Sequence, residues 1–217
     1  METLTLKKSI VELIGTFFLV LTVLTSAVLT GQPLAPLAIG ASLMVMIYAG
    51  GHFSGGHYNP AVSLGVWLRG RLSTQELPFY IGAQLFGAVL AWLAATSLLP
   101  GKTAAAVGSH PGVLPVVLAE FLFTFALVYV VLNAATAKRN AGTGFYGLAI
   151  GFTVVTGAVA VGGISGGAFN PAVAFGVSLV TKGGVLCFET IWQHLAGQIA
   201  AAVAASALFR FLYPEDK

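Results

Sequence analysis

Two triplets of the sequence, Asn59-Pro60-Ala61 and Asn170-Pro171-Ala172, combine residue types that begin helices and bind polar groups. Asparagine is a preferred helix N-cap, and proline suits the first helical position because the missing N–H has no helical partner there. Each triplet therefore predicts the start of a helix. Amide groups at such a point can donate hydrogen bonds to a neutral solute, while the positive end of the helix dipole disfavours cations.

The two triplets belong to a longer internal repeat. Residues 54–65 read SGGHYNPAVSLG and residues 165–176 read SGGAFNPAVAFG, with eight of twelve positions identical at an offset of 111 residues. Two further polar pairs recur at similar offsets, namely Glu12 with Glu120 and Gln84 with Gln198. The chain is therefore interpreted as a tandem duplication, with repeat 1 at about 1–105 and repeat 2 at about 106–217.

Composition places these repeats in a membrane. Of 217 residues, 57% are hydrophobic and only 8% are charged, which excludes both a soluble globular surface and a disordered chain. A single cysteine, Cys187, excludes an internal disulfide framework. Six apolar stretches are long enough to span a bilayer: roughly 9–30, 34–51, 77–99, 113–134, 142–161 and 186–212. The sequence thus predicts an all-α integral membrane protein forming a single membrane domain.

Three spans per repeat is an odd number, so the second repeat must be inserted upside down relative to the first. The two shorter apolar stretches, 60–68 and 171–181, then enter from opposite sides as re-entrant half-helices that meet near the midplane. With the N-terminus inside, eight Lys and Arg residues, Lys217 included, lie on inner segments and two on outer ones. This bias predicts that both termini are cytoplasmic, in a multi-pass protein of the cell (inner) membrane.

In these features the chain resembles the aquaporin, or major intrinsic protein, family, whose signature is a pair of Asn-Pro-Ala boxes in inverted repeats. The resemblance covers essentially the whole chain. It implies six transmembrane helices plus two half-helices, passive transport of water and small neutral solutes, and a homotetramer with one pore per subunit. It also implies a central constriction at Asn59, Pro60, Ala61, Asn170, Pro171 and Ala172.

The sequence departs from water-selective relatives at the outer selectivity filter. Those relatives carry an arginine directly after the second box, where this chain has Val173. Carried over by offset from the boxes, the other filter positions are Ile39, Ala158 and Gly167. We therefore expect a wide, apolar outer constriction that passes glycerol, urea or un-ionised metalloid hydroxides such as arsenite. The alternative is a strictly water-selective pore, which Ala174 and Trp192 favour.

Other polar residues receive more local interpretations. Glu12 and Glu120 are expected to accept hydrogen bonds from the re-entrant loops, although ionisable groups inside spans can also relay protons. His57 is expected to line the cytoplasmic half of the pore. His194 has no evident counterpart in repeat 1 and is interpreted as a helix–helix contact. The four histidines, His52, His57, His110 and His194, lack metal-ligand spacing, so no metal and no other cofactor is expected.

No nucleophile triad, phosphate loop or nucleotide fingerprint occurs, so an enzyme and a nucleic-acid partner are not expected. Two other classes of transport protein stay open at this point. A proton-coupled secondary transporter would also show inverted repeats and intramembrane carboxylates. An ammonia- or ion-conducting pore is made conceivable by the missing arginine.

Overall fold

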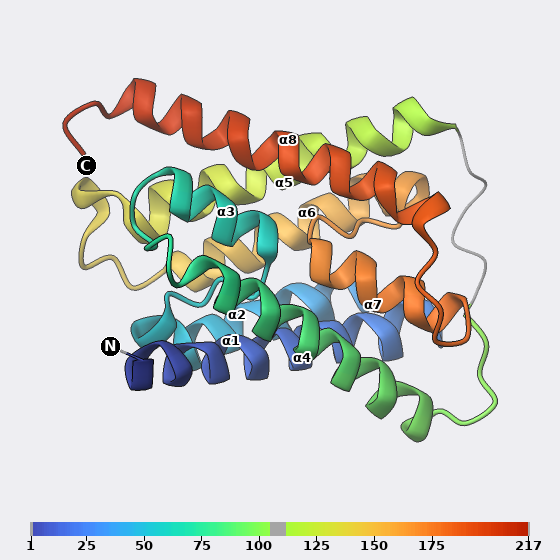
Figure 1. Ribbon diagram of the computed structural model, residues 1–217. Helices are drawn as coiled ribbons and strands as arrows, with labels where there is room; N and C mark the ends of the chain where they lie inside the picture. The colour runs from blue at the N-terminus through green and yellow to red at the C-terminus, as the bar shows by residue number, and fades with distance from the viewer. Residues whose placement is uncertain (1, 105–111, 217) are drawn as a thin grey trace.

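The computed structural model describes residues 2–104 and 112–216 and shows a bundle of long helices around two short ones (Figure 1). The long helices are α1 (Glu2–Thr22), α2 (Ala35–Ser54), α4 (Leu77–Leu98), α5 (Val113–Val131), α6 (Tyr146–Ser165) and α8 (Phe188–Leu212). The short ones are α3 (Pro60–Leu68) and α7 (Pro171–Thr181). π-Helical turns, Val23–Val28 and Leu132–Thr136, extend α1 and α5, and a 3₁₀ turn follows at Lys138–Asn140.

Within the described residues, six helical segments are long and apolar enough to cross a membrane. They match the six predicted spans in number and order. The two half-helices begin and end at the residues that the sequence predicted, 60–68 and 171–181. Both start in the middle of the bundle and run to opposite ends of it (Figure 1). Both chain termini lie at one end, which we call the terminal face; α7 ends at the opposite face.

The long helices pack in pairs that follow the duplication: α1 against α4, α5 against α8, and α2 against α6. The last pair crosses at Gly40 and Gly151, where a Cβ on either glycine would lie 2.5 Å from the carbonyl oxygen of the other. Two elements with inverted orientation therefore meet at equivalent residues, as an inverted repeat requires. Small residues permit this approach of two backbones.

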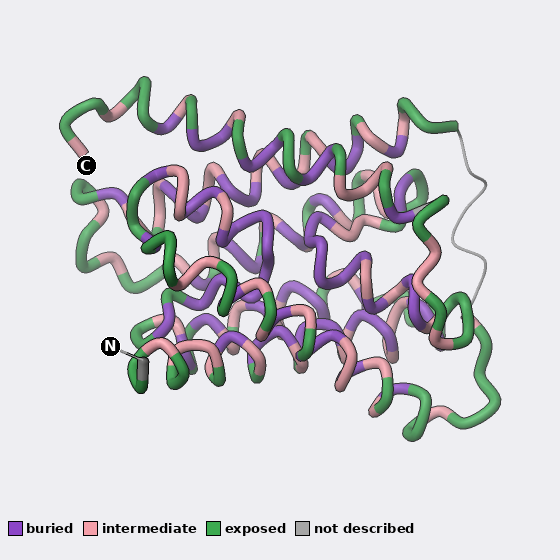
Figure 2. The backbone as a smooth tube through the Cα atoms, viewed as in Figure 1, coloured by how far each residue is buried: buried purple, intermediate pink, exposed green. Residues whose placement is uncertain are grey.

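The distribution of buried and exposed residues suits a lipid environment rather than water (Figure 2). Large apolar side chains such as Phe86, Leu122 and Phe152 are about half exposed on the outside of the bundle. Polar side chains such as Glu12 and Glu120 are completely buried at its centre. Because apolar side chains cover the outside of its long helices, the bundle requires an apolar solvent around its middle.

The re-entrant loops are shorter than we expected from the sequence. The predicted spans 34–51 and 142–161 end too early, because α2 continues to Ser54 and α6 to Ser165. Each helix ends where a glycine adopts the left-handed conformation, Gly55 at φ 94° and Gly166 at φ 87°. The earlier glycines of each run, such as Gly51 and Gly162, keep helical geometry and accept the capping hydrogen bonds. The non-helical backbone is thus reduced to residues 55–59 and 166–170.

Three features predicted from the sequence lie outside the described residues. They are the boundary between the repeats near 105 and 106, His110, and Lys217.

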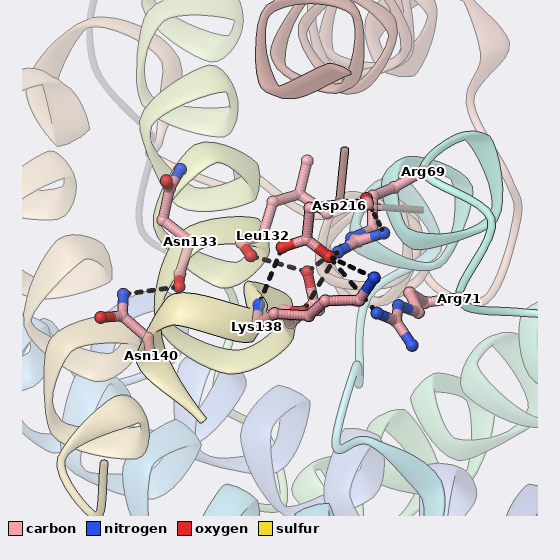
Figure 3. Close-up of polar contacts among 8 residues, drawn as sticks. Arg69, Arg71, Leu132, Asn133, Lys138, Asn140 and Asp216 are labelled. Atoms are coloured by element: carbon pink, nitrogen blue, oxygen red, sulfur yellow. Dashed lines mark hydrogen bonds and ion pairs between the residues drawn. The ribbon is translucent and has the colours of Figure 1, made fainter. Parts of the chain in front are cut away.

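A cluster of polar contacts fastens the C-terminal end of α3 at the terminal face (Figure 3). The buried Arg69 side chain lies with Nη2 2.7 Å from Asp216 Oδ1, and its Nη1 donates to the Asp216 carbonyl at 2.9 Å. Arg69 Nε donates to Thr136 Oγ1 at 2.9 Å, and the Lys138 N–H donates to Asp216 Oδ2 at 2.8 Å. Asp216 therefore joins the chain end, the half-helix and the α5–α6 connection.

This cluster predicts a pH-dependent contribution to stability. Partial burial acts to raise the pKa of the Asp216 carboxyl, but the Lys138 N–H and the Arg69 guanidinium outweigh it, so the pKa lies below its ordinary value. A carboxyl whose pKa is lowered by folding stabilises the protein above its unfolded pKa of about 3.9, and that stabilisation is lost as the pH falls through the folded value. We expect Asp216→Asn to melt at a lower temperature than wild type in detergent at pH 7. The gap should shrink as the pH is lowered below about 4.

Glu215→Gln, a change at the exposed neighbouring residue, is the matched control and should melt like wild type at both pH values. An Asp216→Asn deficit of equal size at neutral and acid pH would contradict the assignment.

Candidate functional site

The two half-helices are joined at their N-termini by their capping asparagines. Asn59 Oδ1 accepts from the Ala61 N–H at 2.8 Å, and Asn170 Oδ1 accepts from the Ala172 N–H at 2.9 Å. Each amide nitrogen reaches across to the other repeat: Asn59 Nδ2 donates to the Phe169 carbonyl and Asn170 Nδ2 to the Tyr58 carbonyl, both at 2.9 Å. The positive ends of two helix dipoles are thereby held at one point.

These contacts reduce the number of hydrogen-bond donors that the two asparagines can offer to a solute. We expected both amide groups to serve a solute, but one N–H of each already binds the opposite loop. An amide nitrogen carries two hydrogens, so each asparagine keeps one donor for a solute. Both asparagines line the central cavity described below. The pair therefore offers two donors whose direction is set by the rest of the network.

The residue before each asparagine is held in an unfavourable backbone conformation. Tyr58 and Phe169 both have φ of 48°, a left-handed value that costs a bulky residue free energy unless its surroundings impose it. The Tyr58 N–H donates to Glu12 Oε2 at 2.7 Å, and the Phe169 N–H donates to Glu120 Oε2 at 2.8 Å. Both carboxylates are completely buried behind the loops. They fix the turn that brings each asparagine into the pore.

Each carboxylate accepts four hydrogen bonds, and the two sets are equivalent. Glu12 accepts from Ser54 Oγ, His57 N, Tyr58 N and Gln84 Nε2. Glu120 accepts from Ser165 Oγ, Ala168 N, Phe169 N and Gln198 Nε2. The distances range from 2.7 to 3.0 Å. This arrangement is the loop-supporting role expected from the sequence, and the oxygens are occupied by donors.

His194 makes the helix–helix contact that we expected, between α8 and the last residue of α6, but we were wrong that it has no counterpart in repeat 1. The Tyr80 hydroxyl donates to the Ser54 carbonyl at 2.6 Å, and His194 Nε2 lies 2.8 Å from the Ser165 carbonyl. Residues 80 and 194 are separated by 114 positions, the same offset as Gln84 and Gln198. The offset could have revealed the pair, but the side chains differ, so a search for identical residues missed it. His194 thus joins α8 to the last residue of α6, directly before the second re-entrant loop.

One cavity of about 710 Å³ runs through the site. Asn59, Asn170 and His57 lie on its wall, and it extends to exposed residues at the opposite face, including Thr181 and Lys182. Pro60, Ala61, Pro171 and Ala172 are buried in the first turns of the half-helices and are not among its lining residues. Their contribution is to the geometry of the half-helices.

All four residues assigned to the outer filter line this cavity: Ile39, Ala158, Gly167 and Val173. They come from α2, α6, the second re-entrant loop and α7. Gly167 has φ of 66°, and a Cβ built on it would lie 3.5 Å from Ala158 Cα. Gly167 therefore packs directly on α6, and a larger residue at 167 would be strained by its left-handed backbone. None of the four side chains offers a charge or a polar hydrogen.

His57 lines the cavity on the side toward the terminal face. Its Nδ1 lies 3.1 Å from Ser63 Oγ, and the same hydroxyl oxygen accepts from Gln84 Nε2 at 2.9 Å. The ring also packs on Tyr80, with centroids 5.1 Å apart. Its orientation is thus coupled to the network around Glu12. Repeat 2 has Ala174 in the place of Ser63, so this contact exists on one side only.

Comparisons with known proteins agree with this architecture. The family model for the major intrinsic protein family matches residues 2–209. The chain is 33% identical to aquaporin NIP1-1 of Zea mays, over 95% of this chain and 75% of that protein. It is 31% identical to nodulin-26 of Glycine max, over 98% of this chain and 80% of that protein. An aquaglyceroporin of Plasmodium falciparum has a similar fold, with a TM-score of 0.77, 21% identity and coverage of 97% and 96% of the two chains.

The inverted repeats and the paired half-helices define a polytopic membrane channel. The chain belongs to the major intrinsic protein, or aquaporin, family. Its members are channels for water and small solutes and are not enzymes. The fold is therefore an all-α membrane fold with two inverted three-helix repeats.

Replacement of a loop-supporting carboxylate should disable the channel. In Glu120→Gln, the amide nitrogen would face the backbone N–H of Ala168 or of Phe169, and the two donors bound to the replaced oxygen would lose their acceptor. We expect a loss of about 3 kcal/mol of stability, because hydrogen bonds to a buried charged group are broken. The measurements are the melting temperature in detergent and water permeability by stopped-flow light scattering.

Glu189→Gln changes an exposed carboxylate of α8 and is the control, which should keep both properties. If Glu120→Gln melts and conducts like the control, Glu120 does not hold the loop.

Proposed function

We propose that this protein is a passive channel for neutral solutes larger than water, such as glycerol, urea and un-ionised metalloid hydroxides, in addition to water. The observation that supports this proposal most directly is Val173, which lies on the cavity wall directly after the second Asn-Pro-Ala box. Arginine at this place would supply a positive charge and several fixed donors. Valine supplies neither and is smaller.

The replacement of arginine by valine changes which molecules can cross the outer constriction. A narrow site with a charged donor favours water, which replaces its own hydrogen bonds easily. An apolar site of Ile39, Ala158, Gly167 and Val173 admits a molecule with a carbon or urea skeleton, whose apolar surface contacts the wall. The small residues Ala158 and Gly167 add width on one side. Selection by size is thereby relaxed at this site.

Charge selection lies deeper, at the centre of the pore. A neutral hydroxyl or carbonyl group can accept the remaining N–H of Asn59 and of Asn170, and backbone carbonyls of residues 55–58 and 166–169 can accept its hydrogens. A cation meets the N-terminal ends of α3 and α7, which carry about half a positive charge each. The central constriction of Asn59, Pro60, Ala61, Asn170, Pro171 and Ala172 is thus proposed to reject ions while passing neutral solutes.

The contacts of the carboxylates favour a channel over a proton-coupled carrier. Glu12 and Glu120 each accept four hydrogen bonds from residues that build the loops. Protonation in a transport cycle would weaken those bonds and release the strained backbone. A permanent, ionised support suits a pore with a constant shape.

We further propose the assembly and the location that family membership implies. The chain forms one channel domain with its own pore in a homotetramer in the cell (inner) membrane. The terminal face, with Arg69, Arg71 and Lys138, is assigned to the cytoplasm by its positive charges. The opposite face, with Lys182, is then external. Exposed apolar side chains on the helices supply the surface for neighbouring subunits and lipid.

The proposed assembly has a direct measurement. The chain mass is 22.3 kDa, and native mass spectrometry of the purified protein in detergent should show a species of four chains. A protein that conducts while monomeric would contradict the tetramer and leave the pore assignment unaffected.

The filter assignment predicts the outcome of a single substitution. Val173→Arg should abolish uptake of glycerol and urea and retain water flux, because the guanidinium narrows the site and binds water through fixed donors. Proteoliposomes with the wild-type protein should take up both solutes at least about tenfold faster than the variant, which corresponds to roughly 1.4 kcal/mol at the barrier. Stopped-flow light scattering measures all three fluxes.

Val173→Met is the control for size without charge and should reduce solute uptake less than arginine does. Fast water flux with no glycerol or urea uptake in wild type would contradict the wide pore. Another side chain would then close the mouth, and the channel would be water-selective.

A further inference from the structure

A chain of hydrogen bonds in repeat 1 leads from the buried Glu12 to the ring of His57 on the cavity wall. Glu12 Oε2 accepts from Gln84 Nε2 at 2.9 Å, and the same nitrogen donates to Ser63 Oγ at 2.9 Å. Ser63 Oγ in turn lies 3.1 Å from His57 Nδ1. Gln84 and Ser63 are completely buried, so each hydrogen of these two side chains must find its acceptor inside the protein.

The direction of each bond follows from the groups at its two ends. Both oxygens of Glu12 accept hydrogen bonds, so Gln84 presents its NH₂ group to the carboxylate and uses its second hydrogen on Ser63. The Ser63 oxygen is therefore an acceptor, and its own hydrogen has one acceptor among the described residues, His57 Nδ1. A hydrogen on Nδ1 would leave the buried hydroxyl hydrogen without a partner. Because Nδ1 must accept, the neutral ring carries its hydrogen on Nε2.

The Nε2 atom of His57 is the end of this chain and is available to the pore. His57 lines the cavity, and within residues 2–104 and 112–216 its Nε2 has no hydrogen-bond partner in the protein. A Cβ built on Gly55 would lie 2.9 Å from Nε2, and Gly55 is an exposed residue at the start of the re-entrant loop. An Nε2–H at this place can therefore donate to a solute in the cavity.

We propose that Ser63 is a positioning residue that holds His57 as the Nε2–H tautomer and thereby gives the pore a third fixed donor. This donor lies on the side of the asparagines that faces the terminal face. It suits solutes that carry a carbonyl or hydroxyl oxygen, such as urea and glycerol. The effect on solute uptake rests on the proposed function, whereas the tautomer itself does not.

Repeat 2 contains the beginning of this chain and lacks its end. Gln198 Nε2 donates to Glu120 Oε2 at 2.7 Å, as the equivalent glutamine does in repeat 1. Ala174 stands in the place of the serine and Ala168 in the place of the histidine, both at the offset of 111 residues. The serine and the histidine are thus replaced together, as expected if they act as a pair. The supported donor is a feature of the terminal side alone.

Nitrogen NMR tests the tautomer directly, because protonated and unprotonated ring nitrogens of histidine have well-separated chemical shifts. The full-length protein, with ¹⁵N-labelled histidine, is measured in lipid bilayers at about pH 8, where imidazole is ordinarily neutral. The His57 signals are those that are lost in His57→Gln. We expect the Nε2–H tautomer alone in wild type and a mixture of both tautomers in Ser63→Ala. Ser63→Thr retains the hydroxyl and should give the wild-type tautomer.

Uptake of urea and glycerol is measured on the same variants in proteoliposomes by stopped-flow light scattering. Ser63→Ala should slow the uptake of both solutes by about fivefold, as expected for the loss of one hydrogen bond at the barrier, and Ser63→Thr should restore it. Ser206→Ala is the matched control, because Ser206 is a buried serine of α8 that donates to Gly65 of α3 and is not a lining residue of the cavity. It should keep the wild-type tautomer and the wild-type uptake.

The Nδ1–H tautomer in wild type overturns the inference, even if no Ser63 variant folds. A pure Nε2–H tautomer in Ser63→Ala, or uptake by this variant equal to that of Ser206→Ala, also overturns it. Absence of urea and glycerol uptake by wild type above that of protein-free liposomes instead overturns the proposed function. The effect on uptake then falls with it, while the NMR spectra still decide the tautomer.

Discussion

The structure depends on one constraint: polar backbone inside a membrane must be satisfied by the protein itself. Residues 55–59 and 166–170 leave helical geometry in the middle of the bundle, with the cavity on one side of them and buried carboxylates on the other. Glu12 and Glu120 supply the missing acceptors on the other side, with two backbone N–H groups bound to each carboxylate. The left-handed conformations of Tyr58 and Phe169 persist because these bonds and the surrounding packing impose them. The positions of Asn59 and Asn170 follow from that backbone.

Because the chain is duplicated, the same residue types meet this constraint in both repeats. The duplication also explains the shape of the pore. Inverted copies bring two helix N-termini together, so their dipoles add at the midplane and the asparagines exchange hydrogen bonds across the repeat boundary. Gly40 and Gly151 allow α2 and α6 to approach at equivalent points. The centre of the molecule is therefore closed by symmetric hydrogen bonds, and in the proposed function it is also the barrier to cations. The repeats differ at single positions, such as Ser63 against Ala174 and Tyr80 against His194, so the contacts around the two loops are not identical.

At the outer constriction the chain keeps the pattern of its own repeat and departs from the pattern of water-selective relatives. Val173 matches Val62 of repeat 1, so the arginine-free filter preserves the duplicated pattern. Ala158 and Gly167 lie side by side, and the left-handed Gly167 limits what can replace it. In the proposed function, charge selection is therefore concentrated at the N-terminal ends of α3 and α7. In that proposal, the separation of size selection from charge selection distinguishes this pore from one closed by a filter arginine.

The amino-acid sequence by itself determined the class, the number of spans, the half-helix bounds and the pairing of Glu12 with Glu120, because apolar length and identical repeated residues are local signals. The ends of α2 and α6 were placed too early, since glycine runs do not show which glycine turns left-handed. The pairing of Tyr80 with His194 required the tertiary structure, because unlike side chains can donate to the same carbonyl. Tertiary structure also decided that each asparagine spends one N–H on the opposite loop and that Asp216 reaches Arg69. These contacts join residues more than a hundred positions apart, and only the packed bundle brings their atoms together.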